Sequence, residues 1–504
     1  MRDGAHAVDG PAATGTFVLA IDQGTSATKA VVIDGSGAVV ARATCAVGQS
    51  FPRPGWAEQD GHELADSARR AVADCLAALP AGTGPDQVAT LALSTQRESV
   101  LLWDRATGVP LGPVLGWQDI RAAGVCAELV AAGHGLRVRE LTGLPLDAMF
   151  SAAKARALLD LHDPERTRSR AGELCLGTID SWLVFTLTGE HRIETGCAAR
   201  TQLLDIARRA WDPWLLDLFG VPAEILPTVT ASTGPFGTVR GLHPDLDGRA
   251  VTGVLGDSHA ALFAHAGWVP GRVKATYGTG CSVMGVAPGP VTTGGGIART
   301  LAWELDEPRY ALEGNIRSSG ATLVWLARLF GTTVEELLST AADDAEGVTL
   351  VPAFTGLGAP WWDENAAGLV AGLSESTGPG QLARAALESI AFQVADVVAA
   401  VEESAGPVEV VLADGGPSAN PTLMQLQADL AGRRVEVSAV RELSAVGAAQ
   451  LAGVGAGLWT LADLERRAAA RTPYLPADGT DRESRLSAWH AAVDAARRTP
   501  RRNP

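Results

Sequence analysis

The sequence lacks paired cysteines. Its six cysteines show no CxxC spacing and no other paired-ligand pattern; they are Cys45, Cys75, Cys126, Cys175, Cys197 and Cys281. A structural zinc site or a disulfide framework would need such pairs. We therefore expect six reduced and mostly buried thiols in a cytoplasmic protein.

Positive charge is also scarce. The net charge is −16 and the pI is about 5.1, and no basic stripe interrupts the acidic background. Because a folded acidic protein binds nucleic acid poorly, we expect no nucleic-acid partner. Hydrophobic residues make up 46% of the 504 positions, which excludes global disorder and suffices for two or three domains.

The apolar core of a signal peptide is missing from the start of the chain. Residues 1–15 are small, polar and rich in glycine, and we expect a flexible tail there. Residues 443–462 carry no charge, but they contain four glycines and several polar side chains. This composition favours a close-packed buried helix followed by a glycine turn over a membrane span, so we expect no membrane partner.

The most informative stretch is Asp22-Gln23-Gly24-Thr25-Ser26, which lies between two apolar, strand-like runs. Glycine allows backbone N–H groups to face inward, and hydroxyl groups add further donors, so this turn could hold phosphate. A carboxylate beside a phosphate site would suit Mg²⁺. An ordinary polar hairpin turn is the alternative, because short glycine motifs often match by chance.

The hydrophobic pattern predicts alternating strands and helices. We expect strands at 17–22, 29–34, 38–41, 88–94, 100–104, 251–255, 273–277, 281–286 and 408–413, and helices at 61–79, 154–162, 177–187, 321–330 and 382–403. The strand, Gly/Thr turn, strand arrangement recurs at Gly278-Thr279-Gly280, about 250 residues after the first. We infer two similar α/β halves that meet near 258–270.

A third glycine turn, residues 414–418, follows the last of these strands. Asn420 and Pro421 then predict a helix start, with Asn as the N-cap and Pro in the first helical position. A strand, glycine turn and helix in this order favours a nucleotide site, because the helix N-terminus attracts anions; a plain βα turn is the alternative. With Asp257 at the end of another strand, the set suggests ATP-dependent phosphoryl transfer.

Longer motifs make the prediction specific. The chain resembles the FGGY carbohydrate kinases, and glycerol kinases most closely, over about residues 17–460. The matching residues are Asp22-Gln23-Gly24-Thr25, Pro54-Gly55-Trp56, Gln96-Arg97-Glu98, Trp117-Gln118, Tyr277-Gly278-Thr279-Gly280-Cys281, Ala311-Leu312-Glu313-Gly314, the run 351–360, the second family signature over 368–388, and Asp414-Gly415-Gly416 with Asn420.

The resemblance implies an α/β fold of two actin/hexokinase-like (ribonuclease H-type) domains hinged around a central cleft. We expect the domains at 16–265, with the substrate site and the first phosphate loop, and at 266–498, with the second phosphate loop and the adenosine site. Residues 1–15 and 499–504 would be tails.

The resemblance also implies site residues, with ATP and Mg²⁺ as cofactors. Asp257 would be the catalytic base, and Asp22 and Asp257 would be near the metal. The polyol would be held by Arg97, Glu98, Trp117 and Asp257. ATP would be bound by Gln23, Gly24, Thr25, Ser26, Lys29, Gly278, Thr279, Gly280, Gly320, Gly415, Gly416 and Asn420. Without the resemblance, a salt bridge, core packing and a helix cap would explain Arg97-Glu98, Trp117 and Asp257 respectively.

The residues themselves agree with this chemistry. A carboxylate within hydrogen-bond reach can orient a sugar hydroxyl and accept its proton as the phosphoryl group is transferred. Lys29 stands where glycerol kinases have arginine, which keeps the positive charge but loses the bidentate geometry.

Several positions depart from the family pattern. Met149, Ser258 and Ser282 replace a tyrosine, a glutamine and an aromatic residue of the substrate site, and Ala157 replaces a tryptophan of the first signature. Asp119 and Arg121 instead match the Trp-x-Asp-x-Arg pattern of pentulose kinases. Because a site that binds hydroxyls by hydrogen bonds discriminates sharply, we expect an altered substrate, with room for a longer polyol or a ketose.

The predicted function is ATP-dependent phosphorylation of a primary hydroxyl of a small polyol or ketose. Glycerol and a four- or five-carbon substrate stay open, including the activity of a pentulose (xylulose-type) or tetritol kinase. A non-catalytic protein that senses sugar or nucleotide, and an ATPase that works by motion alone, are alternatives of another class. The sequence leaves a homodimer or homotetramer open.

Overall fold

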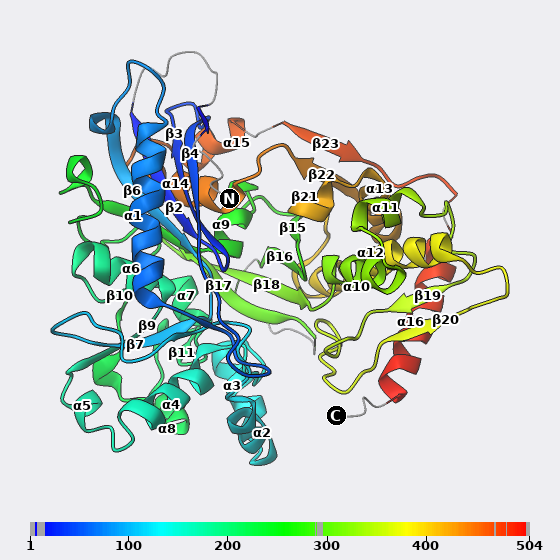
Figure 1. The fold of residues 1–504 in the computed structure, drawn as a ribbon, viewed down its shortest axis with the longest axis horizontal. Coiled ribbons are helices and arrows are strands. Elements are labelled where there is room, and N and C mark those ends of the chain that lie inside the picture. The colour runs from blue at the N-terminus through cyan, green and yellow to red at the C-terminus, as the bar shows by residue number, and fades with distance from the viewer. Residues whose placement is uncertain are drawn as a thin grey trace. The chain divides into compact units, whose positions relative to one another are not determined.

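The computed structural model describes residues 6–7, 16–287, 289, 296–467, 470–479 and 481–499. Most of the predicted tails, at 1–15 and 499–504, lies outside the described residues. The chain forms two compact units, drawn in Figure 1. Unit 1 comprises Met1–Ala266, Arg299–Tyr310 and Glu442–Ala468, and unit 2 comprises Gly267–Ala298, Ala311–Arg441 and Ala469–Pro504.

Unit 1 is built on a six-stranded sheet with the order β1-β4-β3-β2-β6-β14. The strands are β1 (His6–Ala7), β2 (Phe17–Gln23), β3 (Ala27–Ile33), β4 (Val39–Ala46), β6 (Val88–Thr95) and β14 (Val251–Gly256). β2, β3 and β4 form an antiparallel meander, whereas β6 runs parallel to β2 and β14 parallel to β6. The carboxyl ends of β2, β6 and β14 therefore lie at one edge of the sheet, where ligands typically bind in open α/β sheets.

Helices cover both faces of this sheet. α1 (Gly61–Ala77) packs on β3 and β4 and α6 (Ile179–Thr188) on β6, while α14 (Leu443–Gly455) packs on β2, β6 and β14 and against α9 (Asp257–Ala264). One face of α1 is buried in the same core as β2 and β6, through Leu64, Ala68, Ala71 and Cys75. Asp60 caps α1 by accepting hydrogen bonds from two backbone N–H groups of its first turn.

The contact between α14 and α9 is unusually close. A Cβ atom on Gly447 would lie 1.8 Å from the carbonyl oxygen of Ala260, so only glycine allows the two helix backbones to approach this far. Ser444 Oγ donates a hydrogen bond of 3.1 Å to the carbonyl of Asp257, the first residue of α9. Residues more than 180 positions later in the chain thus support the start of α9.

The remainder of unit 1 is a helical region around a small sheet with the order β5-β8-β7-β9. Its strands are β5 (Glu58–Gln59), β7 (Val100–Asp104), β8 (Val114–Leu115) and β9 (Leu174–Thr178). The other elements of unit 1 are α2 (Ala123–Ala131), α3 (Gly135–Thr142), α4 (Ser151–His162), α5 (Thr167–Arg170), α7 (Thr195–Ala199), α8 (Pro213–Phe219), α15 (Leu461–Arg466), β10 (Arg192–Glu194), β11 (Leu204–Asp205), β12 (Ala210–Trp211), β13 (Thr228–Thr230) and the 3₁₀ turns η1 (Pro85–Gln87), η2 (Ala223–Ile225) and η3 (Pro244–Leu246).

Unit 2 repeats the strand scheme of unit 1. β15 (Arg272–Tyr277) and β16 (Cys281–Ala287) form an antiparallel hairpin, β21 (Val410–Asp414) runs parallel to β15, and β22 (Arg434–Ser438) runs parallel to β21. β23 (Arg471–Tyr474) adds an antiparallel edge. Further strands of unit 2 are β19 (Thr349–Val351), β20 (Leu369–Ala371) and most of β18 (Pro308–Ile316), whereas β17 (Ala298–Glu304) belongs to unit 1 from Arg299 onward.

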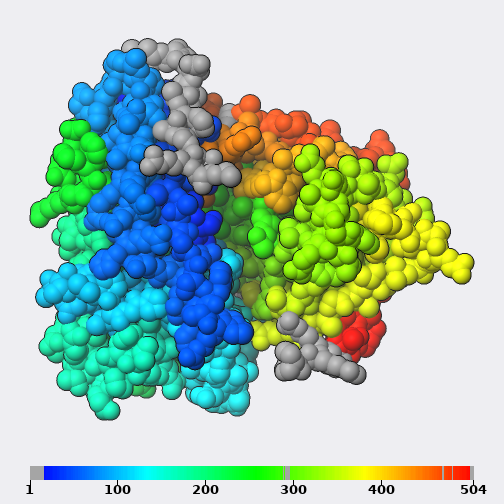
Figure 2. Space-filling view, in the orientation of Figure 1, coloured from blue at the N-terminus to red at the C-terminus, as the bar shows by residue number. Residues whose placement is uncertain are grey.

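The helices of unit 2 centre on α12 (Pro379–Ala405), which packs against α13 (Pro421–Ala431) and α10 (Gly320–Phe330). α11 (Val334–Ser339), α16 (Arg482–Arg498) and the 3₁₀ turn η4 (Gly416–Ala419) complete the unit. α10 and α11, in yellow-green, form part of the visible surface in Figure 2, which agrees with the exposure of Val324 and Leu329.

Most predicted elements are confirmed within one to three residues, including the repeated hairpin, the helix at 443–455 and the Asn420 N-cap. The predicted helix at 177–187 is wrong at its start, because residues 177 and 178 belong to β9 and α6 begins only at Ile179. All six cysteines are free, and all but Cys45 are buried. Within the described residues we find no helix with the length and apolar character needed to cross a bilayer.

The α14–α9 contact gives a first prediction. Gly447→Ala should lower the free energy of unfolding by at least about 3 kcal/mol, because the added methyl group would overlap a backbone carbonyl that cannot move without moving α9. Gly124→Ala is the matched control: it lies in helix α2 with no atom within 4 Å of the added methyl, so it should not destabilise. Urea unfolding of the three proteins measures this; equal midpoints for Gly447→Ala and wild type would contradict the close packing.

Candidate functional site

The first Gly/Thr turn joins β2 to β3 and is closed by a hydrogen bond of 3.0 Å from Gly24 N–H to the carbonyl three residues later. The side chain of Gln23 lies fully buried below the turn, where its amide oxygen accepts a hydrogen bond of 2.8 Å from Thr28 Oγ1. Thr25 is half-buried and Ser26 is exposed. The turn therefore presents glycine backbone and two hydroxyl groups, while the Gln23 side chain supports it from within.

Asp22 is the last residue but one of β2, the strand that leads into this turn, and it is 7% exposed. Ser94 Oγ donates a hydrogen bond of 2.7 Å to its carboxylate. Burial raises the pKa of the Asp22 carboxyl; the charge of Lys29 and the Ser94 hydrogen bond lower this pKa, and the negative charge of Asp257 raises it again. Asp22 and Asp257 thus repel each other across the edge of the sheet.

These residues fit a divalent cation. A cation would relieve the repulsion between Asp22 and Asp257 that raises the Asp22 pKa. In the part of the chain that the structure describes, no group of three or more His, Cys, Asp or Glu side chains could hold a metal by itself. Mg²⁺ typically takes one or two protein carboxylates and completes its shell with water and substrate phosphate oxygens, so two carboxylates suffice.

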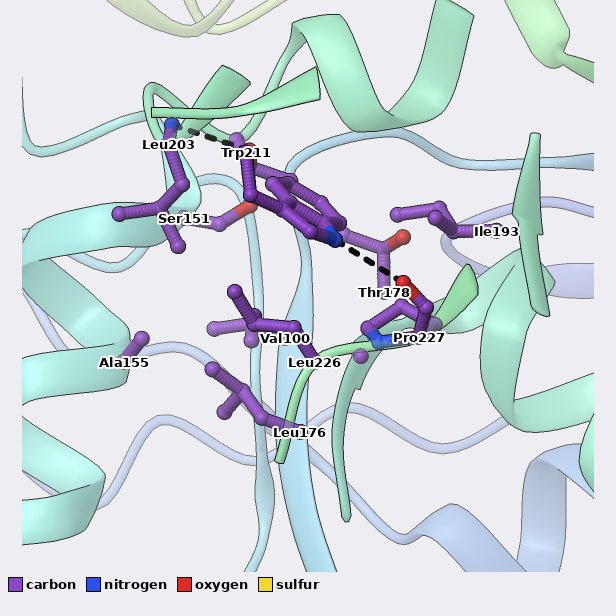
Figure 3. Close-up of a pocket in the computed structure, with 12 residues that line it drawn as sticks. Val100, Ser151, Ala155, Leu176, Thr178, Ile193, Leu203, Trp211, Leu226 and Pro227 are labelled. Atoms are coloured by element: carbon purple, nitrogen blue, oxygen red, sulfur yellow. Dashed lines mark hydrogen bonds between the residues drawn. The ribbon is translucent and has the colours of Figure 1, made fainter. Parts of the chain in front are cut away.

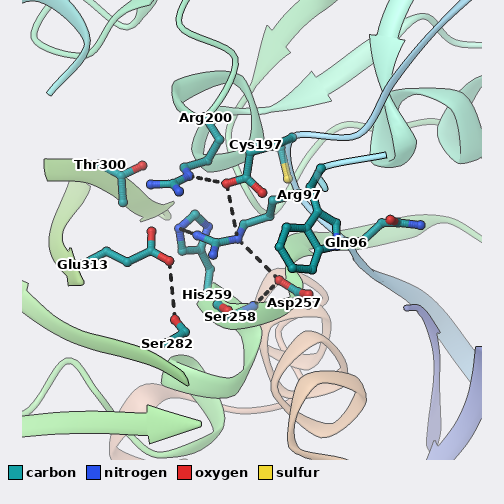
Figure 4. Close-up of polar contacts among 12 residues, drawn as sticks. Gln96, Arg97, Cys197, Arg200, Asp257, Ser258, His259, Ser282, Thr300 and Glu313 are labelled. Atoms are coloured by element: carbon teal, nitrogen blue, oxygen red, sulfur yellow. Dashed lines mark hydrogen bonds and ion pairs between the residues drawn. The ribbon is translucent and has the colours of Figure 1, made fainter. Parts of the chain in front are cut away.

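Charged side chains from three elements meet beside Asp257 (Figure 4). Arg97, which follows β6, places its Nε 3.4 Å from Asp257 Oδ1 and 4.0 Å from Glu98 Oε1, and its Nη1 3.3 Å from His259 Nε2. Arg200 Nε donates a hydrogen bond of 2.6 Å to Glu98 Oε1. Since Asp257 is also 39% exposed, its carboxylate is held by a charge on one side and reachable from solvent on the other.

Two features of this cluster indicate a site rather than a simple ion pair. Glu98 has a φ of +63°, a left-handed conformation that is unfavourable for a residue with a side chain and that is often found at functional sites. Arg200 is fully buried, with its guanidinium carbon 5.0 Å from the centre of the Phe150 ring. Arg200 is not predicted from the sequence, because no motif surrounds it and its partner lies about 100 residues away.

Trp117 and Met149 line the same region of unit 1. The backbone N–H of Trp117 donates to Ser99 Oγ at 3.0 Å, and its indole N–H donates to Thr25 Oγ1 at 3.1 Å. The indole is 37% exposed and so offers a flat apolar surface instead of filling the core. Met149 is half-buried, and its backbone N–H donates to Asp147 Oδ1 at 2.8 Å.

Asp119 and Arg121 have a structural role in this chain. Arg121 Nη2 donates to Asp119 at 2.8 Å and to Glu58 at 2.6 Å, and its guanidinium carbon lies 3.7 Å from the centre of the Trp56 ring. The fully buried Asp119 also accepts the backbone N–H of Ala57. These contacts fix the loop after Trp117. The hydrogen-bonding groups of Asp119 and Arg121 are thereby engaged within the protein.

Ser258 follows Asp257 in the first turn of α9. Its backbone N–H donates to Asp257 Oδ1 at 2.6 Å, and its short side chain is half-buried. A carboxylate at a helix N-terminus is favoured in its charged form by the helix dipole. The start of α9 therefore adds to Arg97 in interacting favourably with the negative charge of Asp257.

The second Gly/Thr turn, in unit 2, is shaped by close backbone contacts. The N–H of Gly278 donates to the Gly280 carbonyl at 2.8 Å, and the N–H of Gly320, the first residue of α10, donates to the Gly278 carbonyl at 2.9 Å. A Cβ atom on Gly320 would lie 2.7 Å from that carbonyl oxygen, so glycine is required there. Thr279 is exposed at the tip of the turn, where a ligand can reach its hydroxyl.

The third turn lies beside the second in unit 2. Gly415 has a φ of +92°, and a Cβ atom there would come within 2.0 Å of the Tyr277 carbonyl oxygen. A Cβ atom on Gly416 would instead meet no atom within 4 Å, which leaves open space over the backbone. Asn420 Oδ1 accepts the Leu423 N–H at 2.9 Å and so caps α13. This is the open, donor-rich geometry that anions and nucleotides use.

Ser282 lies in β16 and is half-buried. Its Oγ is 3.4 Å from Oε1 of the fully buried Glu313 in β18, a contact drawn in Figure 4. The predicted site residues therefore fall into two groups, one in each unit. Unit 1 holds the first Gly/Thr turn with the acidic, cationic and aromatic residues, and unit 2 holds Ser282 with the second and third turns.

An apolar cavity in unit 1 is separate from these residues (Figure 3). It is lined mainly by aliphatic side chains and Trp211, whose indole N–H donates to the Pro227 carbonyl at 2.9 Å. Its volume of about 10 Å³ is room for one water molecule at most. It cannot hold a sugar or a nucleotide.

Comparison with known proteins gives matches over almost the whole chain. The N-terminal domain of the FGGY family of carbohydrate kinases matches residues 17–264, and its C-terminal domain matches residues 273–456. A glycerol kinase from Aromatoleum aromaticum is 42% identical over 96% of this chain and 99% of its own. A glycerol kinase from Symbiobacterium thermophilum is 40% identical over 95% of this chain and 98% of its own.

Solved structures show the same fold. The chain is similar to Plasmodium falciparum glycerol kinase with ADP, with a TM-score of 0.89, 28% identity and coverage of 97% of this chain and 99% of that chain. It is also similar to ligand-bound xylulose kinase from Lactobacillus acidophilus, with a TM-score of 0.84, 21% identity and coverage of 95% and 97%. The expected actin/hexokinase-like architecture is thereby confirmed.

The buried Arg200–Glu98 pair gives a second prediction. Arg200→Leu should lower the free energy of unfolding by about 3–5 kcal/mol, because it removes one partner of a fully buried ion pair and leaves the Glu98 carboxylate poorly compensated. Arg208→Leu is the control, since Arg208 is 65% exposed and lies 3.8 Å from Asp212; it should change stability by less than about 0.5 kcal/mol. Similar unfolding midpoints for the two variants would contradict the role given to Arg200.

Proposed function

The chain belongs to the FGGY family of carbohydrate kinases, and from that premise we propose that it transfers the γ-phosphoryl group of ATP to a primary hydroxyl of a small polyol. The observation that carries the proposal is Asp257, a partly exposed carboxylate at the start of α9, held 3.4 Å from Arg97 and near Asp22. Phosphoryl transfer to an alcohol needs a group that positions the hydroxyl and takes its proton.

Asp257 is the proposed base. Arg97 and the N-terminus of α9 interact favourably with its negative charge, and a carboxylate oxygen accepts a hydrogen bond from the substrate hydroxyl. As the hydroxyl oxygen forms its bond to the γ-phosphorus, the bond from that phosphorus to the β,γ-bridging oxygen breaks, and the hydroxyl proton passes to Asp257. ADP leaves with the bridging oxygen.

The polyol is proposed to lie against Arg97, Glu98 and Trp117. The guanidinium and the carboxylate supply donors and acceptors for neighbouring hydroxyls, and both are fixed by buried partners. The exposed face of the Trp117 indole covers the carbon chain. A pre-ordered set of this kind binds hydroxyls without first having to rearrange.

ATP is proposed to bind through the three turns. Gly24, Thr25, Ser26 and Lys29 in unit 1 supply backbone, hydroxyl and ammonium donors for phosphate, with Gln23 supporting the turn from below. The contributing residues of unit 2 are Gly278, Thr279, Gly280, Gly320, Gly415, Gly416 and Asn420. Asp22 and Asp257 would hold Mg²⁺, which when bound neutralises charge on the phosphate groups.

The acceptor is proposed to be a polyol of four or five carbons, with glycerol a weaker substrate. The support is the loss of three binding groups relative to glycerol kinases, at Met149, Ser258 and Ser282. Pentulose kinase activity, with a five-carbon ketose as the acceptor, is the second candidate. The pentulose-like Asp119 and Arg121 do not favour it, because Arg121 binds Glu58 and packs on Trp56, while Asp119 accepts hydrogen bonds from Arg121 and from the backbone N–H of Ala57.

The protein is further proposed to act in the cytoplasm, since its six free thiols suit a reducing compartment.

Substitution of the base gives a third prediction. Asp257→Asn should lower kcat by roughly 10²–10⁴-fold, because the amide cannot accept the hydroxyl proton, while the fold and ATP binding are kept. Asp217→Asn, on the exposed surface of α8, is the matched control and should leave turnover unchanged. The measurement is polyol-dependent ADP release; turnover of Asp257→Asn near that of wild type would overturn the assignment of the base.

The substrate assignment gives a fourth prediction. Some four- or five-carbon polyol or ketose should exceed glycerol in kcat/KM by at least roughly tenfold, since each lost hydrogen-bonding or stacking partner is worth about 1–3 kcal/mol. The triple variant Met149→Tyr, Ser258→Gln, Ser282→Phe should shift preference back toward glycerol. A wild-type enzyme that prefers glycerol over every longer substrate would refute this part of the proposal and leave the kinase activity standing.

A further inference from the structure

Lysine is nearly absent from this chain. It has three lysines, Lys29, Lys154 and Lys274, against 38 arginines, and Lys154 and Lys274 are both fully buried. The chain thus uses arginine at almost every position that needs a cation. A compact ammonium group with three donors fits a tight buried position that the planar guanidinium does not. Lys154 is therefore a place where the shape of lysine matters.

Lys154 lies in the first turn of α4 and bonds to two loops. Its Nζ donates to the Gly116 carbonyl at 3.0 Å and to the Met149 carbonyl at 2.7 Å. Gly116 directly precedes Trp117, and Met149 is itself a predicted substrate residue. One ammonium group therefore ties together two segments of unit 1 that are more than 30 residues apart in sequence.

Ser151, the first residue of α4, bonds to a third segment. Its Oγ donates to the carbonyl of Glu98 at 3.0 Å, which fixes the left-handed backbone of that residue. Ser151 is 2% exposed, so this hydrogen bond is shielded from water. The first turn of α4 thus contacts the backbone of all three segments that carry Glu98, Trp117 and Met149.

We propose, on the basis of the proposed function, that the first turn of α4 positions the polyol-facing segments of unit 1 through Lys154 and Ser151 and thereby sets which polyol is accepted. Neither side chain touches the reacting atoms in this account. Both act through the backbone of the residues that bind substrate. Their loss would therefore alter polyol binding and discrimination more than the chemical step.

The surroundings of Lys154 agree with this role. Burial lowers the pKa of its ammonium group to about 8, and the negative charges of Glu98, Asp119 and Asp147 and the nearby Cys126 act in the opposite direction. At neutral pH the side chain is therefore mostly charged, and a charged donor makes stronger hydrogen bonds to carbonyl groups than a neutral one. Because the group is buried, removing it would take the ammonium donor from the Met149 carbonyl and leave the Gly116 carbonyl with only the Asp119 N–H.

The test is steady-state kinetics of Lys154→Met, which keeps the length of the side chain and removes the donor. Its KM for the best polyol should rise about tenfold or more, with kcat within about threefold of wild type and KM for ATP unchanged. The ratio of kcat/KM between the best and the next polyol should fall towards one. KM and this ratio do not depend on the fraction of folded enzyme, so partial loss of stability does not mimic the effect.

Two further variants keep the test decisive. Lys274→Met removes the other fully buried lysine, whose Nζ donates to Thr276 Oγ1 at 2.9 Å, and it should leave the ratio between polyols unchanged. Ser151→Ala is milder, removes only the hydrogen bond to Glu98, and should raise the polyol KM about threefold.

The outcomes separate the two proposals. If wild type consumes ATP in response to polyol but neither Lys154→Met nor Ser151→Ala changes the polyol KM or the ratio, the positioning role is wrong and the proposed function stands. The positioning role is also overturned if Lys154→Met fails to fold and Ser151→Ala behaves as wild type, or if kcat falls with KM unchanged. If wild type shows no polyol-dependent ATP consumption, the proposed function itself fails.

Discussion

The position of Asp257 depends on how closely α14 packs against α9. Glycine at position 447 lets the two helix backbones approach until a methyl group would overlap the Ala260 carbonyl, and Ser444 bonds the carbonyl of Asp257 itself. From the other side Arg97 holds the carboxylate at 3.4 Å. A base must be placed to within a fraction of an ångström to act on a hydroxyl, and rigid helix packing supplies that precision better than a loop would.

Around this proposed base, unit 1 concentrates features that cost stability. Glu98 has a strained backbone, Arg200 and Lys154 are charged and fully buried, and burial raises the pKa of Asp22. Each is tolerated because it has a close partner. Ser151 bonds the backbone of Glu98, and the Glu98 carboxylate accepts from Arg200. Two carbonyl groups accept from Lys154, and the Ser94 hydroxyl donates to Asp22. Such local violations of the usual folding rules are expected at sites that must bind polar ligands in a fixed geometry.

Local signals in the sequence predict much of this structure. Both Gly/Thr hairpin turns, the helix α1 and the Asn420 cap depend on residues close together in the chain, and all are found as expected. The roles of Arg200, Lys154 and α14 depend on partners from about 40 to 200 residues away, which no local pattern shows. For the same reason the sequence indicates Gln23 as a ligand residue but not that its side chain is buried beneath the turn.

The central claim is that this chain phosphorylates a small polyol. The most direct measurement incubates the purified protein with ATP, Mg²⁺ and single polyols of three to five carbons, and follows ADP and the phosphorylated polyol together by ³¹P NMR. The account predicts one phosphomonoester on a terminal carbon for each ADP formed, and almost no ADP without polyol. ADP formed at the same rate without polyol, or with no phosphorylated polyol, would contradict it.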